Sequence, residues 1–474
     1  MAKTFFFYDL ETSGINPRDQ RIMQFAGQRT DMDLKPVGDP VNVLVKLTPD
    51  IMPEPDAILI TGITPQKTLE EGYTEAEFLK IFFDEVATAD TIFVGYNSIR
   101  FDDEFMRFTL YRNFYDSYEW QWQDGRGRWD LLDVVRMTRA LRPDGIVWPF
   151  APDGKPSNRL EYMTSVNKLS HESAHDALSD VYATIAVANL IKNNQPKLFD
   201  YLLNIRDKKS VSDLVQEGVS FVYCSGKYAG EFEKTTVAVK LCDHPKQQGA
   251  LVYDLRNDPS EFLNLSAEEL AERWAYTRDE NALKRLPIKT LQYNRCPAVA
   301  PLKVLDEKSI KRISIDLGAT KKHKEILLSD KNFVSKVLKA LEILDKKQQQ
   351  RFFENSNDVD SRLYDGFVGQ DDKIKMSAVR AAKAVDININ DFNFKDDRLN
   401  QMLPLYKARN YPKLLNNDEK KLWQDFCRQR FEYGGEKSRI SKFETRILEL
   451  AARLSNTKND VYLLEELKLY VESL

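Results

Sequence analysis

The sequence predicts an α/β domain at the start of the chain, a β-rich region in the middle and an all-α region at the end. Residues 4–10 form a short apolar run rich in aromatics, which is typical of a buried strand. After residue 193 the chain gives short strand-like runs. From about residue 331 apolar residues recur at intervals of three and four, the spacing of amphipathic helices.

The first part of the chain begins with strands and then alternates between helix and strand. Residues 23–33 and 41–49 predict two further strands of a meander, because turn-prone polar residues separate them. Residues 74–86 have helical spacing, and Thr74 suits the N-cap position. Residues 91–96 form another buried strand. This order is typical of an α/β layer.

The pattern changes at residues 193–202, where polar residues and a proline indicate a domain boundary. The strand-like runs that follow lie at residues 220–226, 235–242 and 250–255. The helical pattern is clearest at residues 333–354, 438–455 and 460–473. The middle region is therefore expected to form a small β-rich domain, and the last third an all-α domain.

The net charge of −4 is distributed unevenly along the 474 residues. Residues 1–195 hold 20 Lys and Arg against 30 Asp and Glu, whereas the remainder holds 49 against 43. An acidic part suits a site that concentrates divalent cations, and a basic part suits one that holds a polyanion. An uneven scatter of solvated charges would give the same asymmetry, so charge alone does not decide the function.

The cysteines and the hydropathy exclude several classes of protein. The four cysteines lie far apart without a CxxC pair, which argues against a zinc site and a disulfide framework. We expect buried free thiols at Cys224, Cys242, Cys296 and Cys427. No window reaches the roughly 18 apolar residues of a membrane span, and residues 1–10 show no apolar run followed by a cleavage site. We therefore expect a cytoplasmic protein without a membrane partner.

Asp9 and Glu11 are the first residues that suggest chemistry. They lie two positions apart at the end of the first strand, so alternation places both side chains on one face of the sheet. Two neighbouring anions at a buried strand end are costly unless a cation neutralises them, and Mg²⁺ takes carboxylate oxygens. A solvated strand end without a metal is the alternative for this pair alone.

A second acidic element follows the strand at residues 91–96. Asn97, Phe101 and Asp102 lie in the segment GYNSIRFDDEFMRF, which opens a helix at the C-terminal end of that strand. Open α/β sheets place their ligand sites at such strand ends. Asp103 is an alternative ligand, and either acid could instead cap the helix and favour its positive N-terminus.

The third element is the segment SHESAHDALSDVYATIAVANLI, which contains His175 and Asp180. Ser173 with Asp176 three residues later approaches a capping box and predicts that a helix starts here, with His175 in its first turn. A lone histidine at that position is also consistent with a surface or capping residue. The site therefore depends on the three elements together.

In the order D-x-E, N-x-x-x-F-D and H-x-x-x-x-D, these elements resemble the DEDD exonuclease superfamily in its histidine-containing branch. Similarity to the bacterial exonuclease I family extends along nearly the whole chain. The segments that carry it are LITGITPQ, GYNSIRFDDE, YRNFYDSYEWQWQ, RWDLLDV, HDALSDVYATIA, RLYDGF and YKARNYP.

The resemblance implies three domains that close into a groove for single-stranded DNA. These are an RNase H-like exonuclease domain with a mixed sheet and flanking helices at residues 1–195, an SH3-like domain at 196–350 and a helical C-terminal domain at 351–474. The implied activity degrades single-stranded DNA from the 3′ end to 5′-mononucleotides, in DNA repair and recombination. The alternatives are a 3′ to 5′ exoribonuclease and a non-catalytic single-stranded-DNA-binding adaptor.

The resemblance also assigns roles to individual residues. It implies two Mg²⁺ ions, with Mn²⁺ as an alternative, and His175 as the general base that deprotonates the attacking water. Asp102 is preferred to Asp103 because the family's ligand directly follows the phenylalanine. Glu11 and Arg159 match substrate-binding positions. The four metal ligands that the family pattern implies are Asp9, Glu11, Asp102 and Asp180.

Residues 111–129 interleave aromatic and basic side chains, as in a base-stacking surface beside a cationic path. Several of these aromatics could instead be core residues, and for Trp129, beside an apolar run, we expect the core. The resemblance further implies a monomer that binds the acidic, phenylalanine-ended tail of single-stranded-DNA-binding protein through Arg142 and Tyr201. The positions that match DNA contacts are Arg107, Tyr118, Trp122, Arg136 and Asn158.

Overall fold

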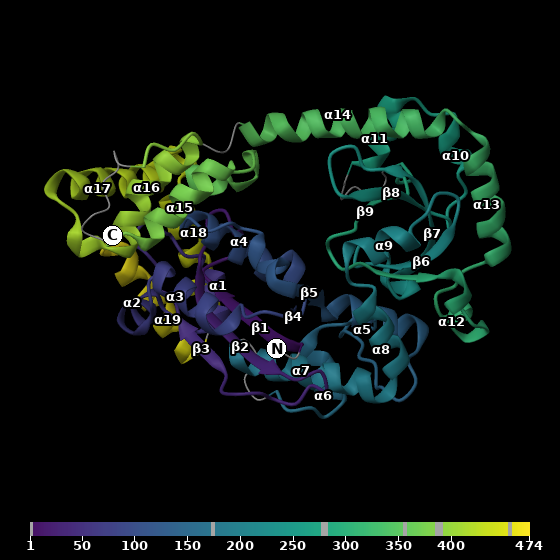
Figure 1. Cartoon of the computed structure of the whole chain (residues 1–474), viewed down its shortest axis with the longest axis horizontal. Helices are drawn as coiled ribbons and strands as arrows, with labels where there is room; N and C mark the ends of the chain where they lie inside the picture. Colours follow the sequence, from purple (N-terminus) through teal and green to yellow (C-terminus); the bar gives the residue numbers. More distant parts are fainter. Residues whose placement is uncertain (1–2, 172–175, 276–282, 354–357, 384–391, 454–456) are drawn as a thin grey trace. The chain divides into compact units, whose positions relative to one another are not determined.

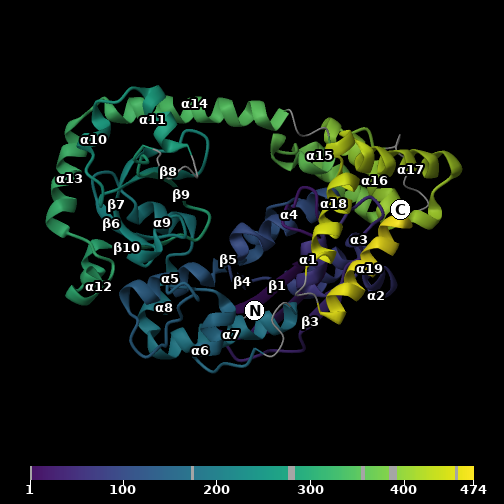
Figure 2. The same ribbon diagram turned by 180° about the vertical axis from the view of Figure 1, so that it is seen from behind.

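The computed structural model describes residues 3–171, 176–275, 283–353, 358–383, 392–453 and 457–474. The chain forms two compact units that are not continuous in sequence. The first comprises residues 1–127, 171–182 and 356–474, and the second comprises residues 128–170 and 183–355. Figure 1 shows the elements of both units, and Figure 2 shows them from behind.

A mixed five-stranded sheet forms the centre of the first part of the chain. The strand order is β3-β2-β1-β4-β5. The middle strand, β1, is antiparallel to β2 and parallel to β4. The α/β fold predicted from the order of strands and helices is confirmed. The strands are β1 (Thr4–Thr12), β2 (Ile22–Thr30), β3 (Val41–Leu44), β4 (Thr91–Gly95) and β5 (Gly127–Asp130).

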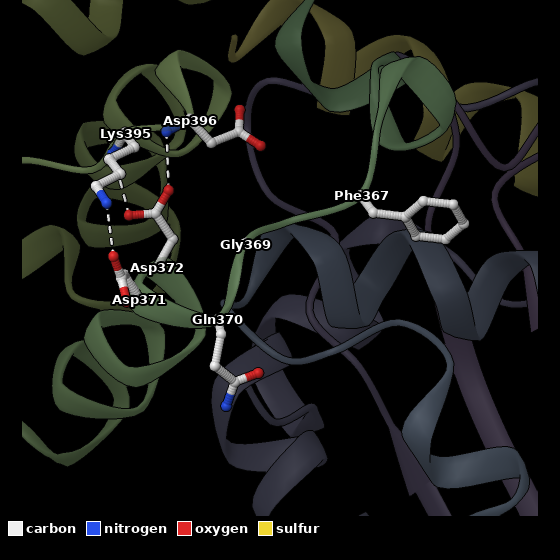
Figure 3. A pocket seen from close by; sticks show the side chains of 7 residues that line it. All are labelled: Phe367, Gly369, Gln370, Asp371, Asp372, Lys395 and Asp396. Carbon is white, nitrogen blue, oxygen red and sulfur yellow. Dashed lines mark hydrogen bonds and ion pairs between the residues drawn. The ribbon is translucent and has the colours of Figure 1, made fainter.

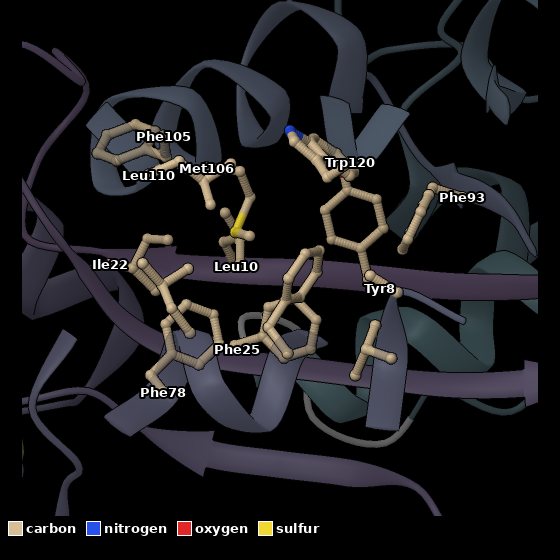
Figure 4. Close-up of a cluster of buried hydrophobic side chains, with 14 of the residues drawn as sticks. Tyr8, Leu10, Ile22, Phe25, Phe78, Phe93, Phe105, Met106, Leu110 and Trp120 are labelled. Atoms are coloured by element: carbon tan, nitrogen blue, oxygen red, sulfur yellow. The ribbon is translucent and has the colours of Figure 1, made fainter. Parts of the chain in front are cut away.

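Strand β1 separates an aromatic core from the acidic residues. Phe6, Tyr8 and Leu10 belong to one buried cluster with aromatic residues of neighbouring elements, among them Trp120 (Figure 4). Because side chains alternate along a strand, Asp9 and Glu11 project from the opposite face. Phe5 and Phe7 on that second face are also buried, so the two acids lie at the C-terminal end of a strand that is covered on both faces.

The helices of the first unit have clear start signals. Thr74 caps α3 in a reciprocal capping box with Glu77, which confirms the predicted N-cap. Helix α4 begins directly at Asp102. The helices of the N-terminal part of this unit are α1 (Pro55–Thr61), α2 (Pro65–Glu71), α3 (Glu75–Ile81) and α4 (Asp102–Arg112).

Five C-terminal helices belong to the same unit as the first strands, and Figure 2 shows α18 and α19 beside α1. One apolar cluster joins Phe108 and Phe114 to Tyr406. Another joins Met23 to Phe443. These helices, all predicted as an α-helical region, are α15 (Gln370–Ala381), α16 (Asp397–Asn410), α17 (Asn417–Glu432), α18 (Arg439–Ala451) and α19 (Lys458–Glu472).

The second unit contains an antiparallel five-stranded sheet, which confirms the predicted β-rich middle region. Its strand order is β10-β6-β7-β8-β9. The strands are β6 (Ser220–Cys224), β7 (Thr235–Asp243), β8 (Gly249–Asp254), β9 (Ile288–Gln292) and β10 (Ala298–Pro301). The four cysteines are free thiols, of which Cys242 is only partly buried.

Helices account for most of the remaining chain. Helix α7 starts in the first unit and continues into the second. Within the described ranges, none of the helices combines the length and the apolar character needed to cross a membrane. The helices are α5 (Leu131–Leu141), α6 (Leu160–Val166), α7 (Ala177–Asn194), α8 (Pro196–Asn204), α9 (Lys208–Leu214), α10 (Ser260–Leu263), α11 (Ala267–Trp274), α12 (Glu307–Arg312), α13 (Leu317–Ser329) and α14 (Phe333–Phe353).

The predicted start of α7 at Ser173 is wrong. The helix begins at Ala177, and the Asp176 carboxylate accepts a hydrogen bond from the backbone N–H of Ser179 at 3.0 Å. Aspartate is as good an N-cap as serine, which explains how Asp176, predicted as the capping-box partner, can itself cap the helix. His175 therefore precedes the helix in sequence. His175 and Ser173 lie outside the described residues.

Candidate active site

Three carboxylates from two distant segments meet in the first unit. Oxygens of Asp9, Glu11 and Asp180 all lie within 4.8 Å of one another. Asp9 and Glu11 come from β1, and Asp180 comes from the first turn of α7. Among the described residues, no other group of three or more acids, histidines or cysteines converges in this way.

The electrostatics of this cluster favour a bound cation. Burial and the neighbouring carboxylates Asp9, Asp180 and Asp176 raise the pKa of Glu11 to about 9. Burial, followed by the charges of Asp102, Asp180 and Asp176, raises the pKa of Asp9 well above its ordinary value. Without a cation, Glu11 therefore resists ionisation near neutral pH, and the pKa of Asp9 is shifted in the same direction. A divalent cation would restore the charged forms, and the oxygen donors suit a hard ion.

Asp102 and Asp103 are both buried, but they face different partners. The negative charge of Asp102 raises the pKa of Asp9, which places Asp102 beside the cluster. Asp103 accepts a hydrogen bond from the Tyr8 hydroxyl at 2.5 Å and favours the charged form of Arg107. Asp103 is thus engaged on the side of the aromatic core, whereas the charge of Asp102 acts on Asp9 although Asp102 is not one of the three described acids whose oxygens lie within 4.8 Å of one another.

Two residues beside the cluster were not predicted as part of the site: His171 had no signal in the sequence, and Asp176 was predicted only as a capping residue. The Nε2 atom of His171 lies 2.5 Å from Oδ1 of Asp180. Asp176 adds negative charge near Asp9 and Glu11 while it caps α7. His171 lies nine residues before Asp180 and outside the helix, so no strand or helix periodicity relates the two.

Three family models match consecutive parts of the chain. Residues 6–188 match "Exonuclease", residues 206–342 match "Exonuclease I SH3-like domain" and residues 357–474 match "Exonuclease I C-terminal domain". Exodeoxyribonuclease I of Haemophilus influenzae is 37% identical over 478 residues, covering 98% of each chain. That of Escherichia coli is 36% identical, covering 99% of this chain and 98% of the relative. The chain belongs to the exonuclease I family.

Solved structures of exonuclease I have the same fold. The enzyme of Methylocaldum szegediense superimposes with a TM-score of 0.93 at 38% identity, covering 100% of this chain and 99% of that one. A zinc-bound E. coli exonuclease I complex with single-stranded DNA gives a TM-score of 0.92 at 34% identity and the same coverage. A structure described as SSB with exonuclease I gives a TM-score of 0.90 at 35% sequence identity, and the match covers both chains completely.

In this exonuclease I family member, the aromatic residues of the predicted base-stacking segment 111–129 differ in exposure. Trp122 is 62% exposed, whereas Trp120 is buried in the aromatic core. Arg107 is buried: it donates to Glu104 at 2.6 Å and to Gln121 at 3.0 Å, and its guanidinium lies 5.5 Å from the centre of the Tyr118 ring. Arg107 thus supports Tyr118 from within the protein.

The remaining predicted contact residues lie in the second unit. Arg136 forms an ion pair with Asp133 at 2.6 Å. Asn158 and Arg159 directly precede α6, and the Arg159 guanidinium lies 6.0 Å from the centre of the Tyr162 ring. Trp129 is buried against Phe199, as we expected.

Arg142 and Tyr201 both contact β10 or the residues that directly follow it. Arg142 donates to the carbonyl oxygen of Val304 at 2.9 Å and pairs with Asp306 at 3.3 Å. The Tyr201 hydroxyl donates to the carbonyl oxygen of Val299 at 3.1 Å. The structure therefore brings both residues to residues 299–306.

A second group of acids, near the C-terminal helices α15 and α16, has a structural role. Asp371, Asp372 and Asp396 line an open pocket of about 420 Å³ (Figure 3). The Asp372 carboxylate accepts the backbone N–H groups of Lys395 at 3.0 Å and Asp396 at 2.8 Å, and Asp371 pairs with the Lys395 ammonium at 2.6 Å. These acids hold the start of α16 in place and do not converge on a common point.

Proposed function

We propose that this protein hydrolyses single-stranded DNA from its 3′ end and releases 5′-mononucleotides, in DNA repair and recombination. The observation that carries the proposal is the convergence of Asp9, Glu11 and Asp180 within an exonuclease domain. Relatives named exodeoxyribonuclease I extend over the whole chain, and one solved relative holds single-stranded DNA. The three domains are inferred to meet near residues 195 and 350.

The proposed metal site consists of Asp9, Glu11, Asp102 and Asp180 and takes two Mg²⁺ ions, with Mn²⁺ as an alternative. The purely oxygen-based donor set and the raised pKa values of Asp9 and Glu11 support hard divalent cations. When bound, such cations activate the attacking water and neutralise charge on the phosphodiester and the leaving oxygen. A solved relative is described as a zinc-bound form, which supports binding of a divalent ion by this chain.

The protein's own residues position the reactants and move the proton. β1 holds Asp9 and Glu11 rigidly, because both residues pair with β2. Glu11 and Arg159 are proposed to bind the terminal nucleotide. His175 is proposed to accept the proton of the attacking water, since the ordinary histidine pKa of about 6.5 suits a base near neutral pH. It lies four residues after His171, which contacts Asp180.

Affinity for single strands is proposed to come from residues outside the acidic cluster. The exposed indole of Trp122 suits stacking on an unpaired base, which is worth about 1–3 kcal/mol per base. Tyr118 presents a ring that Arg107 supports. Arg136 and Asn158 complete the proposed contacts from the second unit.

Partner and cellular context follow from the family. A solved relative is described as a complex with SSB. We propose that this chain binds the acidic tail of single-stranded-DNA-binding protein through Arg142 and Tyr201, and that it acts as a cytoplasmic monomer. The cationic side chain of Arg142 and the apolar ring of Tyr201 suit a tail that ends in acids and a phenylalanine.

The decisive experiment offers the full-length protein three substrates with Mg²⁺: end-labelled single-stranded DNA, duplex DNA and RNA. We expect mononucleotides from the 3′ end of single-stranded DNA, no product in EDTA, and loss of activity in Asp9→Asn. The surface variant Asp371→Asn is the matched control. Preferential loss of RNA would indicate an exoribonuclease, and DNA binding without cleavage would indicate an adaptor; either result would overturn the proposal.

A further inference from the structure

The His171 side chain is buried against one of the three clustered carboxylates. The side chain of His171 is 5% exposed and that of Asp180 is 17% exposed. The distance of 2.5 Å between Nε2 and Oδ1 is that of a short hydrogen bond. An ionised carboxylate only accepts hydrogen bonds, so Nε2 carries the hydrogen in this arrangement.

Asp180 is the member of the cluster that most needs support. Asp9 and Glu11 belong to a central strand, where pairing with β2 fixes their backbone. Asp180 instead comes from the first turn of α7, and its backbone N–H donates to the carbonyl oxygen of Asp176. That bond fixes the main chain and does not by itself set the side-chain torsions.

We propose that His171 is a positioning residue: its Nε2–H fixes the Asp180 carboxylate so that the other oxygen faces Asp9 and Glu11. This inference rests on the proposed function, since it assumes that the acids bind divalent cations. Carboxylates that ligate metals are themselves held by hydrogen bonds, and loss of such a partner typically costs about 10–100-fold in metal affinity or activity. The role differs from that of His175, because His171 does not exchange a proton with the substrate.

The test measures Mn²⁺ binding to the full-length protein by electron paramagnetic resonance of the free ion, beside nuclease kinetics. We expect His171→Ala to weaken Mn²⁺ binding about 10–100-fold and to lower kcat, with little change in KM for DNA. His171→Gln places an amide N–H near the position of Nε2 and is expected to recover most of both losses. His323→Ala, which changes a histidine of the second unit bonded to a backbone carbonyl, is the matched control.

Three results would overturn the inference. The first is His171→Ala with wild-type Mn²⁺ affinity. The second is His171→Gln with an affinity as weak as that of His171→Ala. The third is His171→Gln with normal Mn²⁺ affinity but no activity, which would assign His171 to proton transfer. Thermal melting in EDTA shows whether each variant is folded, and the glutamine variant carries the test if the alanine variant does not fold.

Failure of the proposed function gives a different pattern. In that case the wild-type protein and Asp180→Asn bind Mn²⁺ equally weakly or equally well, or the wild-type protein binds Mn²⁺ at the acidic site without cleaving DNA. Wild-type protein that binds Mn²⁺ and cleaves DNA, together with an unaffected His171→Ala, defeats the positioning role alone.

Discussion

At the scale of the residue, two adjacent acids illustrate how contacts decide roles. Asp102 and Asp103 open the same helix and are both buried. The charge of Asp102 acts on Asp9, whereas Asp103 accepts the Tyr8 hydroxyl. Asp102 therefore belongs with the proposed metal site, and Asp103 links the helix to the core strand.

The two aspartates should respond differently to the same substitution. We expect Asp102→Asn to lower nuclease activity at least about 100-fold. Loss of a residue that only hydrogen-bonds a metal ligand already lowers metal affinity or activity about 10–100-fold. Asp103→Asn should cost stability of about 1–2 kcal/mol by weakening a charge-assisted hydrogen bond, with much less effect on activity. Nuclease assays and chemical denaturation measure the two effects.

Tyr8→Phe provides the control for this comparison. Because Tyr8 and Asp103 share one hydrogen bond, the double variant should lose less stability than the sum of the single variants. Equal losses of activity in Asp102→Asn and Asp103→Asn would contradict the assignment.

At the scale of the element, a buried ionic cluster joins the loop after β3 to the C-terminal helices. Asp360 accepts hydrogen bonds from Arg21, Arg409 and Arg430 at 2.6–2.9 Å. Asp50 accepts from Arg409 at 2.7 Å and from Arg430 at 2.8 Å. Water cannot compensate for a lost charge in this cluster, because the side chains of Asp50 and Asp360 are fully buried.

Removing one charge from this cluster should strongly destabilise the protein. We expect Asp360→Asn to lower the free energy of unfolding by about 3–5 kcal/mol, because buried arginines lose their counter-ion. Asp56→Asn is the control: it breaks the pair with Arg446, whose side chain is 36% exposed against 44% for Asp56, and should cost less than about 1 kcal/mol. Similar losses in both variants would contradict the argument.

The same cluster should control stability in acid. Burial opposes ionisation of Asp360, but Arg409, Arg21 and Arg430 outweigh it and hold its pKa well below the ordinary value. A lowered pKa contributes stability that is present above the unfolded value of about 3.9 and is lost as the pH falls towards the folded value. Melting temperatures below pH 4 should therefore fall steeply in the wild type and less steeply in Asp360→Asn.

At the scale of the whole molecule, the C-terminal helices complete the core of the first unit. Tyr111 and Phe114 of the exonuclease part pack with Met402, and Ile58 packs with Leu467. An isolated N-terminal part would expose these apolar side chains to water. The family's C-terminal domain is therefore part of the fold that carries the acidic cluster.

Deletion of residues 358–474 should yield aggregated or insoluble protein, which size-exclusion chromatography and circular dichroism would detect. A matched pair of point variants in α19 tests the same contact without truncation. Leu467→Ala removes a fully buried side chain and should cost about 2–5 kcal/mol. Leu469→Ala, at a position 59% exposed, should change stability by less than about 0.5 kcal/mol. A soluble, active truncation would contradict this view of the core.

The sequence predicted those features that depend on neighbours along the chain. The apolar run at residues 4–10 predicted a strand, whose alternation puts Asp9 and Glu11 on one face, and Thr74 as an N-cap predicted the start of α3. At the start of α7 the same local reasoning was wrong: it placed the start at Ser173, whereas Asp176 caps a helix that begins at Ala177.

By itself, then, the sequence determined the α/β, β and α regions, the family, and the acids of the proposed site, because periodicity and motifs are local. Only the tertiary structure decided that Asp180 lies within reach of β1, that His171 contacts it, and that Trp120 belongs to the core. Those facts depend on how segments far apart in the chain pack, which no spacing along the sequence encodes.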